Sequence, residues 1–351
     1  MADALKLIAE AKENRLPSLD LGNCGLTELP PEVLDLDWLE VLNLGSDYYH
    51  WNEKDQDWEW NNSANKGKSN LLSSLPADFS KLTRLKSLGI AGSDKIKWKL
   101  SDLRPLSGLV NLQRLFVSQT QVSDLTPVSG LVNLQRLDVS KTQVSDLTPV
   151  NGLVNLQELF VSQTPVSDLT PVSGLVNLQE LFVSQTQVSD LTPLSGLVNL
   201  QVLWVDQTPV SDLTPLGGLV NFHMLWVSET PVSDLTPLSG LVNLYTLSVS
   251  HTQVSDLTPL NGLVNLHRLW VDQTQVSDLT PLSGLVNLQE LGVSQTPVSD
   301  LTPLMAALKK GLKNVECDGC SSLPPAQAAA AKKGGKALLR YLTEQEKEAS
   351  S

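Results

Sequence analysis

Residues 109–130 read LVNLQRLFVSQTQVSDLTPVSG, and near-copies of this 22-residue stretch follow one another without a gap. The copies begin at Leu131, Leu153, Leu175, Leu197, Leu219, Leu241, Leu263 and Leu285. A fixed period of 20–50 residues is typical of solenoids, in which each unit packs only against its neighbours. The repeat therefore predicts one elongated solenoid rather than two or three globular domains.

Each copy contains a short strand followed by a tight return. Leu115 and Val117 alternate with exposed positions, which predicts a strand that lies beside its counterparts in a parallel sheet. Thr126 suits a helix N-cap and Pro127 the first helical position, so the return leg has room for one 3₁₀ or helical turn. Thr120 suits a buried turn, where its hydroxyl can satisfy backbone groups. In the irregular units, the same position is assigned to Cys24, Asp47, Ser93 and Cys320.

A looser L-x-x-L-x-L pattern starts at Leu16, Leu39 and Leu85, and again at Leu312, giving about 13 units over residues 16–323. This pattern resembles the leucine-rich repeat family. Its L-x-x-L-x-L-x-x-T-x-V-S-D-L-T-P-L form is similar to the bacterial, internalin-like class, with Thr where the family usually has Asn. The resemblance implies an α/β solenoid, a leucine-rich repeat horseshoe with a parallel concave sheet and short 3₁₀ or irregular convex turns.

Both ends of the chain differ from the repeats. Residues 1–15 place Leu5, Ile8 and Ala9 on one helical face, which predicts an N-terminal cap. Residues 324–351 are predicted to be helical on both sides of Gly334-Gly335, as a C-terminal cap or linker. This tail resembles the junction between the repeats and the GTPase module of Roco-type proteins, but Ala337 follows Gly334-Gly335-Lys336, so no phosphate-binding P-loop is present. The resemblance implies an alternative role as the sensor arm of a larger bacterial signalling protein, acting within its own polypeptide or by self-association.

An insertion over residues 46–71 interrupts the early repeats and is rich in aromatic residues. A loop of this length without structure of its own is usually functional or disordered, and its aromatic content argues against simple disorder. Packing on the solenoid and a role in binding are equally compatible with the sequence. The residues that would form this second surface are Tyr48, Tyr49, Trp51, Trp58 and Trp60.

Composition narrows the class of partner. Lys and Arg total 25 and Asp and Glu total 38, so the net charge is −13, which argues against a nucleic-acid or anionic-membrane binder. No apolar run reaches the length of a membrane span, and the first residues lack a secretory signal's apolar core. The 3 cysteines cannot form a disulfide framework. We therefore expect a cytoplasmic protein that binds neither nucleic acid nor membrane.

The copies differ from one another mainly at the strand positions that face the open side of the sheet. One column of equivalent positions reads Phe116, Asp138, Phe160, Phe182, Trp204, Trp226, Ser248, Trp270 and Gly292. Exposed aromatic rows usually mark interaction surfaces, and Trp, Tyr and Arg dominate binding hot spots. The predicted partner-binding residues are Phe116, Phe160, Phe182, Trp204, Trp226, Trp270, Arg114, Arg136, Met224 and Tyr245. The alternatives are that the rings only stack along the sheet, or that they mediate self-association.

No catalytic or metal site is predicted, and no cofactor. Glu158 and Glu180 lie on neighbouring strands, near the spacing of a retaining glycosidase, but Arg136 can pair with Glu158 and an open sheet offers no pocket to raise a carboxyl pKa. His223 and His267 are two strands apart, too far to share a zinc ion. The single Cys317-x-x-Cys320 motif fits buried structural positions. The sequence therefore predicts a non-enzymatic module that recognises a protein.

Overall fold

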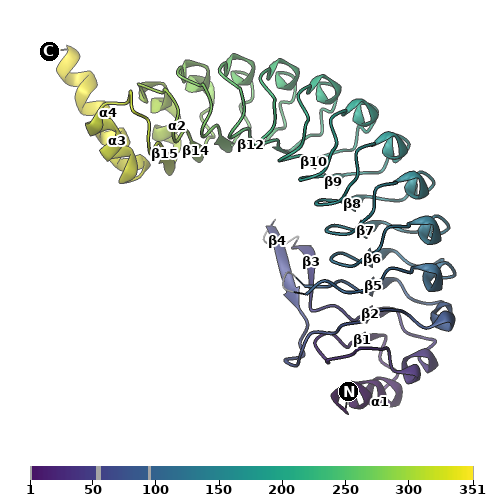
Figure 1. Ribbon diagram of the computed structural model, residues 1–351. Coiled ribbons are helices and arrows are strands. Elements are labelled where there is room, and N and C mark those ends of the chain that lie inside the picture. The colour runs from purple at the N-terminus through teal and green to yellow at the C-terminus, as the bar shows by residue number, and fades with distance from the viewer. Residues whose placement is uncertain (1, 53–56, 94–95, 351) are drawn as a thin grey trace. The chain divides into compact units, whose positions relative to one another are not determined.

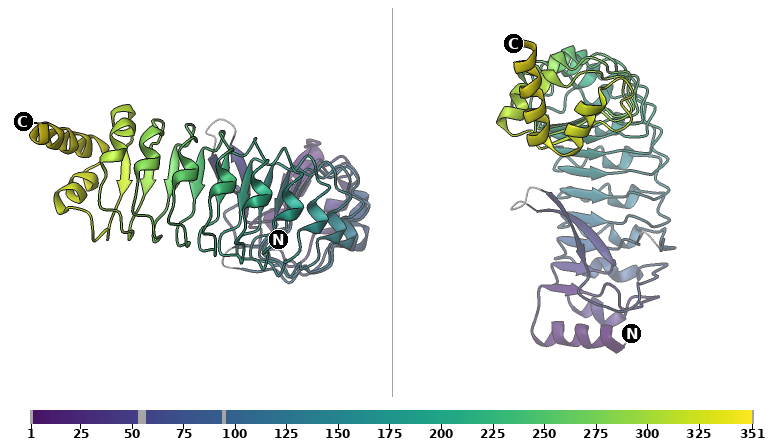
Figure 2. Two further views of the ribbon diagram at one scale, coloured as in Figure 1. Left: turned by 90° about the horizontal axis from the view of Figure 1, so that it is seen from above. Right: turned by 90° about the vertical axis from the view of Figure 1, so that its left-hand side faces the viewer.

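The computed structural model describes residues 2–52, 57–93 and 96–350 (Figure 1). The chain forms two compact units, Met1–Leu178 and Gln179–Ser351. In each unit the strands lie side by side on one face and the 3₁₀ turns lie on the other (Figures 1 and 2). The predicted solenoid of parallel strands and short turns is confirmed.

Unit 1 begins with a helix and continues with strands that pair in parallel in the order β1-β2-β5-β6-β7-β8. Its helix and strands are α1 (Ala2–Glu13), β1 (Ser18–Asp20), β2 (Val41–Asn43), β3 (Asp47–Asn52), β4 (Asp57–Asn62), β5 (Ser87–Gly89), β6 (Arg114–Phe116), β7 (Arg136–Asp138) and β8 (Glu158–Phe160). Its 3₁₀ helices are Pro31–Asp35, Ala77–Lys81, Arg104–Leu106, Thr126–Val128, Thr148–Val150 and Thr170–Val172.

Unit 2 contains parallel strands in the order β9 to β15 and ends in helices. Its strands and α-helices are β9 (Glu180–Phe182), β10 (Val202–Trp204), β11 (Met224–Trp226), β12 (Thr246–Ser248), β13 (Arg268–Trp270), β14 (Glu290–Gly292), α2 (Met305–Lys310), β15 (Asn314–Glu316), α3 (Pro325–Lys332) and α4 (Gly335–Ser350). Its 3₁₀ helices are Thr192–Leu194, Thr214–Leu216, Thr236–Leu238, Thr258–Leu260, Thr280–Gly284 and Thr302–Leu304.

Each coil fills its interior with the aliphatic residues of the repeat. In the first complete copy, the residues that face inward are all at most 1% exposed: Leu112, Leu115, Val117, Val122, Leu125 and Val128. Consecutive strands pair residue for residue, as Leu115 does with Leu137. The constant 22-residue spacing therefore stacks identical side chains into a continuous core.

The threonine column closes the turn after each strand. Thr120 Oγ1 donates to the carbonyl of Val117 at 2.7 Å, and the amide of Val122 lies 3.4 Å from the same hydroxyl. Both bonds stay within one coil, as the predicted role of a backbone-satisfying hydroxyl requires. Equivalent hydroxyl-to-carbonyl bonds are made by Thr142, Thr164, Thr186, Thr208, Thr230, Thr252, Thr274 and Thr296.

The assignment of Asp47 to this column is wrong, because the position belongs to Asn70. The Asn70 side chain is fully buried. It donates to the carbonyls of Leu21 and Leu44 at 2.8 and 2.7 Å and accepts the amide of Leu26 at 2.8 Å. The insertion thus separates the strand of its own unit from the residue that closes that unit's turn.

The expected threonine N-cap is also wrong. Leu125 is the N-cap of the 3₁₀ helix Thr126–Val128, and no side chain bonds to the helix from that position. Instead, Asp124 Oδ1 accepts the Thr126 amide at 2.8 Å. The hydrogen bonds from Thr126 hold the pKa of Asp124 below its ordinary value. The same arrangement and lowered pKa recur at Asp146, Asp190, Asp212, Asp234, Asp256 and Asp278.

These caps predict a pH-dependent contribution to stability. A carboxyl whose pKa is lowered on folding stabilises the fold above its unfolded pKa, near 4, and loses that effect as the pH falls through the folded pKa. We expect Asp234→Ala to lower the unfolding temperature at pH 6, and this difference from the wild type to shrink below about pH 4. Calorimetry from pH 6 to pH 2.5 measures the difference in unfolding temperature. The control is Asp234→Asn, whose side chain keeps a hydrogen-bond acceptor but does not titrate. A difference that stays constant with pH would contradict the assignment.

Helices occur at both ends of the chain (Figure 2). The buried face of α1 is formed by Ala4, Ile8 and Ala11, whereas Leu5 is 41% exposed and Ala9 is exposed, so the predicted face is wrong except for Ile8. At the other end, α3 and α4 lie on either side of Gly334, as predicted, and Leu338 and Leu342 are buried. No helix among the described residues is both long and apolar enough to cross a bilayer.

The insertion is not a structureless loop. Strands β3 and β4 pair antiparallel as a hairpin, with Tyr49 opposite Trp60 and Trp51 opposite Trp58. The amide of Ser63 donates to the carbonyl of Ser46 at 3.0 Å and closes the base of the hairpin. Figures 1 and 2 show the hairpin on the face of unit 1 that carries the strands rather than the 3₁₀ turns.

Candidate functional site

In unit 2, the strand face carries an aromatic row made of Phe182, Trp204, Trp226 and Trp270. The register places Trp204 directly between Phe182 and Trp226. Ring centroids are 4.9 Å apart for Phe182 and Trp204, 5.2 Å for Trp204 and Trp226, and 5.6 Å for Trp226 and Trp270. The four rings are therefore in continuous contact across β9 to β13.

Small residues in the same column provide room for these rings. Ser248 lies between Trp226 and Trp270 in the register, and it is small enough for the two indoles to approach each other across its strand. A Cβ added to Gly292 would lie 2.7 Å from Trp270 Cδ1 and 2.5 Å from Asp272 Oδ2. Ser248 and Gly292 interrupt the aromatic column in the sequence because neighbouring side chains occupy the space above them.

The aromatic row is only partly exposed. Phe182 is 4% exposed, so the expectation that it faces solvent is wrong. Trp204, Trp226 and Trp270 are half-buried. The indole nitrogens of Trp204 and Trp226 are buried without a hydrogen-bond partner in the part of the chain that the structure describes. The accessible part of the row is thus the outer edge of three packed indoles.

Exposed side chains continue this surface toward the N-terminal ends of the strands. Tyr245 is 39% exposed and stacks on His267, with 4.1 Å between ring centroids and 17° between the planes. Met224 precedes Trp226 by two residues and is half-buried. The structure therefore brings Met224 and Tyr245 to the same face as the three tryptophans.

Carboxylates flank the row on its other side. Asp206 Oδ1 accepts the amide of Ser228 at 2.9 Å, and its Oδ2 accepts the hydroxyl of Ser184 at 3.2 Å. Burial raises the pKa of Asp206, and this effect outweighs the lowering of the pKa by the two hydrogen bonds. Asp272 makes the equivalent bonds with Ser294 and Ser250. Both acids tie neighbouring coils together beside the tryptophans.

In unit 1, three of the predicted binding residues form a packed cluster instead of an exposed surface. The guanidinium of Arg136 lies 5.3 Å from the ring centroid of Phe116 and 4.7 Å from that of Phe160. Its Nη1 is 2.8 Å from Glu158 Oε2. Phe116, Arg136 and Phe160 are 6%, 5% and 8% exposed. The expectation of an exposed stripe is wrong for all three, because the arginine fills the space between the two rings.

The predicted pairing of Arg136 with Glu158 is confirmed, but the expectation that an open sheet raises no carboxyl pKa is wrong. Burial raises the pKa of Glu158, and the charges of Arg136 and Arg114 oppose the shift. Burial also raises the pKa of Asp138. Packed side chains on the strand face desolvate these groups even without an enclosed pocket.

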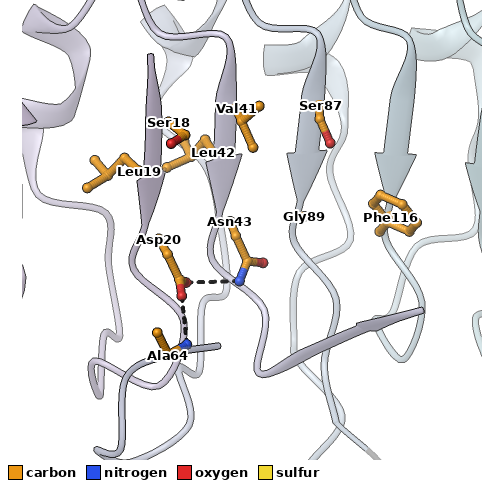
Figure 3. A pocket seen from close by; sticks show the side chains of 10 residues that line it. All are labelled: Ser18, Leu19, Asp20, Val41, Leu42, Asn43, Ala64, Ser87, Gly89 and Phe116. Carbon is orange, nitrogen blue, oxygen red and sulfur yellow. Dashed lines mark hydrogen bonds between the residues drawn. The ribbon is translucent and has the colours of Figure 1, made fainter. Parts of the chain in front are cut away.

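A hollow of about 310 Å³ lies on the strand face near the N-terminus of unit 1 (Figure 3). Gly89, which has no side chain, lies between Asn43 and Phe116 in the register. Asp20 accepts hydrogen bonds from Asn43 Nδ2 and the Ala64 amide at the far end, both at 3.0 Å. The remaining lining residues are Ser18, Leu19, Val41, Leu42 and Ser87. The sequence did not lead us to predict this hollow, although Gly89, which precedes Phe116 in the column of outward strand positions, is a signal for it.

The other candidate residues are not assembled into a site. Among the described residues, no group of three His, Cys, Asp or Glu side chains could hold a metal ion. Cys320 Sγ donates to the carbonyl of Val293 at 3.0 Å, which is a structural role in the threonine column. The side chains of the aromatic residues Tyr48, Tyr49, Trp51, Trp58 and Trp60 lie outside the described part of the chain.

Comparisons with known proteins agree with this architecture. A family profile described as "Leucine Rich repeats (2 copies)" matches residues 176–218. Internalin C2 of Listeria monocytogenes is 35% identical, covering 54% of this chain and 83% of its own, with a TM-score of 0.51. The chain belongs to the leucine-rich repeat family, as the resemblance implied. The comparison with curated proteins found no match.

More distant structures share the fold over most of the chain. An internalin from L. monocytogenes superposes with a TM-score of 0.68 at 21% identity, covering 92% of this chain and 87% of its own. A plant peptide hormone receptor solved in complex with RGF2 has a TM-score of 0.58 at 18% identity, covering 83% of this chain and 50% of its own.

Proposed function

We propose that the chain is a protein-recognition module that binds its partner through the strand face of unit 2. The observation that carries this proposal is the row of half-buried Trp204, Trp226 and Trp270 beside the exposed Tyr245. Large aromatic side chains that are partly buried before binding lose little conformational entropy when a partner covers them. The plant receptor of the same fold is solved in complex with RGF2, which supports a peptide or protein as the class of ligand.

The proposal is tested by affinity capture from the organism's own lysate with matched variants. We expect the double variant Trp204→Ser/Trp226→Ser to capture no partner. Because the two rings touch, this pair should also lower the free energy of unfolding by about 2 kcal/mol. Among the ring pairs of the described residues, Tyr245 contacts only His267. Tyr245→Ser should therefore weaken capture with a smaller effect on the free energy of unfolding.

The matched control is Val220→Ser/Val242→Ser. These valines are 55% and 49% exposed, and each precedes the strand of its coil on the return leg. Capture by the control should equal that of the wild type. Equal capture by wild type and both aromatic variants would contradict the proposal. Light scattering after size exclusion reveals whether the captured partner is a second copy of the chain.

The role as a sensor arm, which the resemblance of the tail to the Roco-type junction implies, remains a prediction. In that alternative, the same strand face would bind an effector domain of the chain's own longer polypeptide. It is distinguished by sequencing the gene beyond Ser351: a continuing reading frame for a GTPase or other effector is required, and a stop codon would exclude it.

A further inference from the structure

Gly89 leaves a gap in a column of larger side chains in unit 1. The register across β1, β2, β5 and β6 runs Asp20, Asn43, Gly89, Phe116. A Cβ added to Gly89 would lie 2.6 Å from Asn43 Oδ1, and the next two nearest heavy atoms also belong to Asn43. Gly89 is buried beside the Asn43 amide and lines the hollow between that amide and the ring of Phe116.

The equivalent small residues in unit 2 are covered by the chain's own indoles. Trp226 and Trp270 approach to 5.6 Å across the strand of Ser248, and Trp270 leans over Gly292. Above Gly89, the 310 Å³ hollow remains instead. This volume is enough for one large side chain, and the lining includes Val41, which is 40% exposed, and the ring of Phe116.

The charges of the described residues around the hollow favour an acidic ligand. Among those residues, Asp20 is the one carboxylate that lines it. Oδ1 of Asp20 accepts the amide of Gly22 and the Asn43 side chain, while Oδ2 accepts the Ser63 hydroxyl and the Ala64 amide. A ligand cation would thus find no unoccupied carboxylate oxygen there. Arg114 lies directly opposite the lining residue Ser87, is exposed, and forms no ion pair with any residue that the structure describes.

We propose that the hollow is a subsite for a peptide that inserts an aromatic or large aliphatic side chain above Gly89 and places an adjacent carboxylate at Arg114. The inserted side chain takes the place that tryptophans of the chain itself take above Ser248 and Gly292. The hydroxyls of Ser18 and Ser87 can donate to the backbone of such a peptide. The idea of a peptide ligand rests on the proposed function, whereas the hollow and its charge do not.

The probe is a capped dipeptide, acetyl-4-fluorophenylalanyl-glutamate amide, observed by ¹⁹F NMR with the full-length chain. We expect a saturable shift of the fluorine signal at millimolar concentrations. The glutamine analogue of the probe should bind about threefold more weakly, the effect of one exposed ion pair. Acetyl-alanyl-glutamate amide, which lacks the ring, should not compete at the same concentration.

Variants locate the probe. Gly89→Leu fills the hollow and should weaken binding at least about tenfold, because burial of the ring is lost. Val41→Glu places a negative charge at the rim and blocks the acidic probe without changing Gly89, in case Gly89→Leu does not fold. Arg114→Gln should remove the preference for glutamate over glutamine. Arg84→Gln, which removes an exposed cation outside the hollow, should leave both affinities unchanged.

Three results would overturn the subsite: no saturable shift, equal binding of the glutamate and glutamine probes, or binding that survives both Gly89→Leu and Val41→Glu. None of them bears on partner capture through Trp204 and Trp226, so the subsite and the proposed function fail independently.

Discussion

Arg136→Met is expected to lower the free energy of unfolding by about 3 kcal/mol at pH 7, because removing one member of a buried ion pair leaves the other charge uncompensated. Arg136 is 5% exposed, touches the rings of Phe116 and Phe160, and lies 2.8 Å from Glu158. Chemical denaturation followed by far-UV circular dichroism measures the loss.

The loss should depend on pH in a defined direction. Burial already raises the pKa of Glu158, and Arg136 opposes that shift. Without Arg136 the folded pKa rises further above the unfolded value, so the penalty is full above the folded pKa and fades as the pH falls toward about 4. Arg136→Met should therefore be less damaging at pH 4.5 than at pH 7.

The chain contains a matched control for this prediction. Arg268 and Glu290 occupy the same strand positions as Arg136 and Glu158, but their side chains are 47% and 37% exposed and 3.7 Å apart. Arg268→Met should cost less than about 1 kcal/mol. In the first cluster, Arg136→Met/Glu158→Gln should recover part of the stability by removing the buried charge. Equal losses for Arg136→Met and Arg268→Met would contradict the description of a buried cluster.

Asn70→Ala is expected to have the largest effect in the early repeats, about 4 kcal/mol. The substitution leaves the carbonyls of Leu21 and Leu44 and the amide of Leu26 buried without their present partner, and each unsatisfied group costs about 1–3 kcal/mol. Asn70→Asp, which has the same shape but cannot donate to the two carbonyls, should be equally damaging. Thr142→Val, which removes one hydroxyl from the equivalent column, should cost about 1 kcal/mol.

Amide hydrogen exchange provides the local measurement for this prediction. Solenoids need not unfold in one step, so a single global transition can miss damage confined to a few coils. The Leu26 amide should lose protection in Asn70→Ala, while amides near Thr142 should not change. Unaltered protection at Leu26 would show that Asn70 does not close the turn of this unit.

The repeat made the fold predictable, since a constant period places Leu115 beside Leu137 without any further information. Asn70 was missed because the insertion moves the turn residue far along the chain from its own strand. The Asp124 cap was missed because the 3₁₀ helix begins at Thr126, one residue later than a threonine cap requires. In the first case the spacing suggested Asp47, and in the second it suggested Thr126, because each has a side chain of suitable chemistry.

The strand face was harder to predict than the core. Alternation correctly places Phe116, Phe160 and Phe182 on the outer side of the strands, but it does not reveal that neighbouring long side chains fold over them. Arg136 covers the two rings in unit 1, and the indole of Trp204 packs against Phe182 in unit 2. Whether an outward residue is exposed therefore depends on the sizes of its neighbours in the adjacent coils, as the small residues Gly89, Ser248 and Gly292 also illustrate.

Recognition of a protein by the strand face of unit 2 is tested most directly by site-specific photo-crosslinking in cells. A photoreactive benzoylphenylalanine is placed either at Tyr245, beside the aromatic row, or at Val242, which is 49% exposed and lies on the return leg of the same coil. We expect a discrete protein crosslink from position 245 that is absent from position 242 and disappears in the Trp204→Ser/Trp226→Ser background. A crosslink that forms only from position 242, or that persists from 245 without the tryptophans, would contradict it.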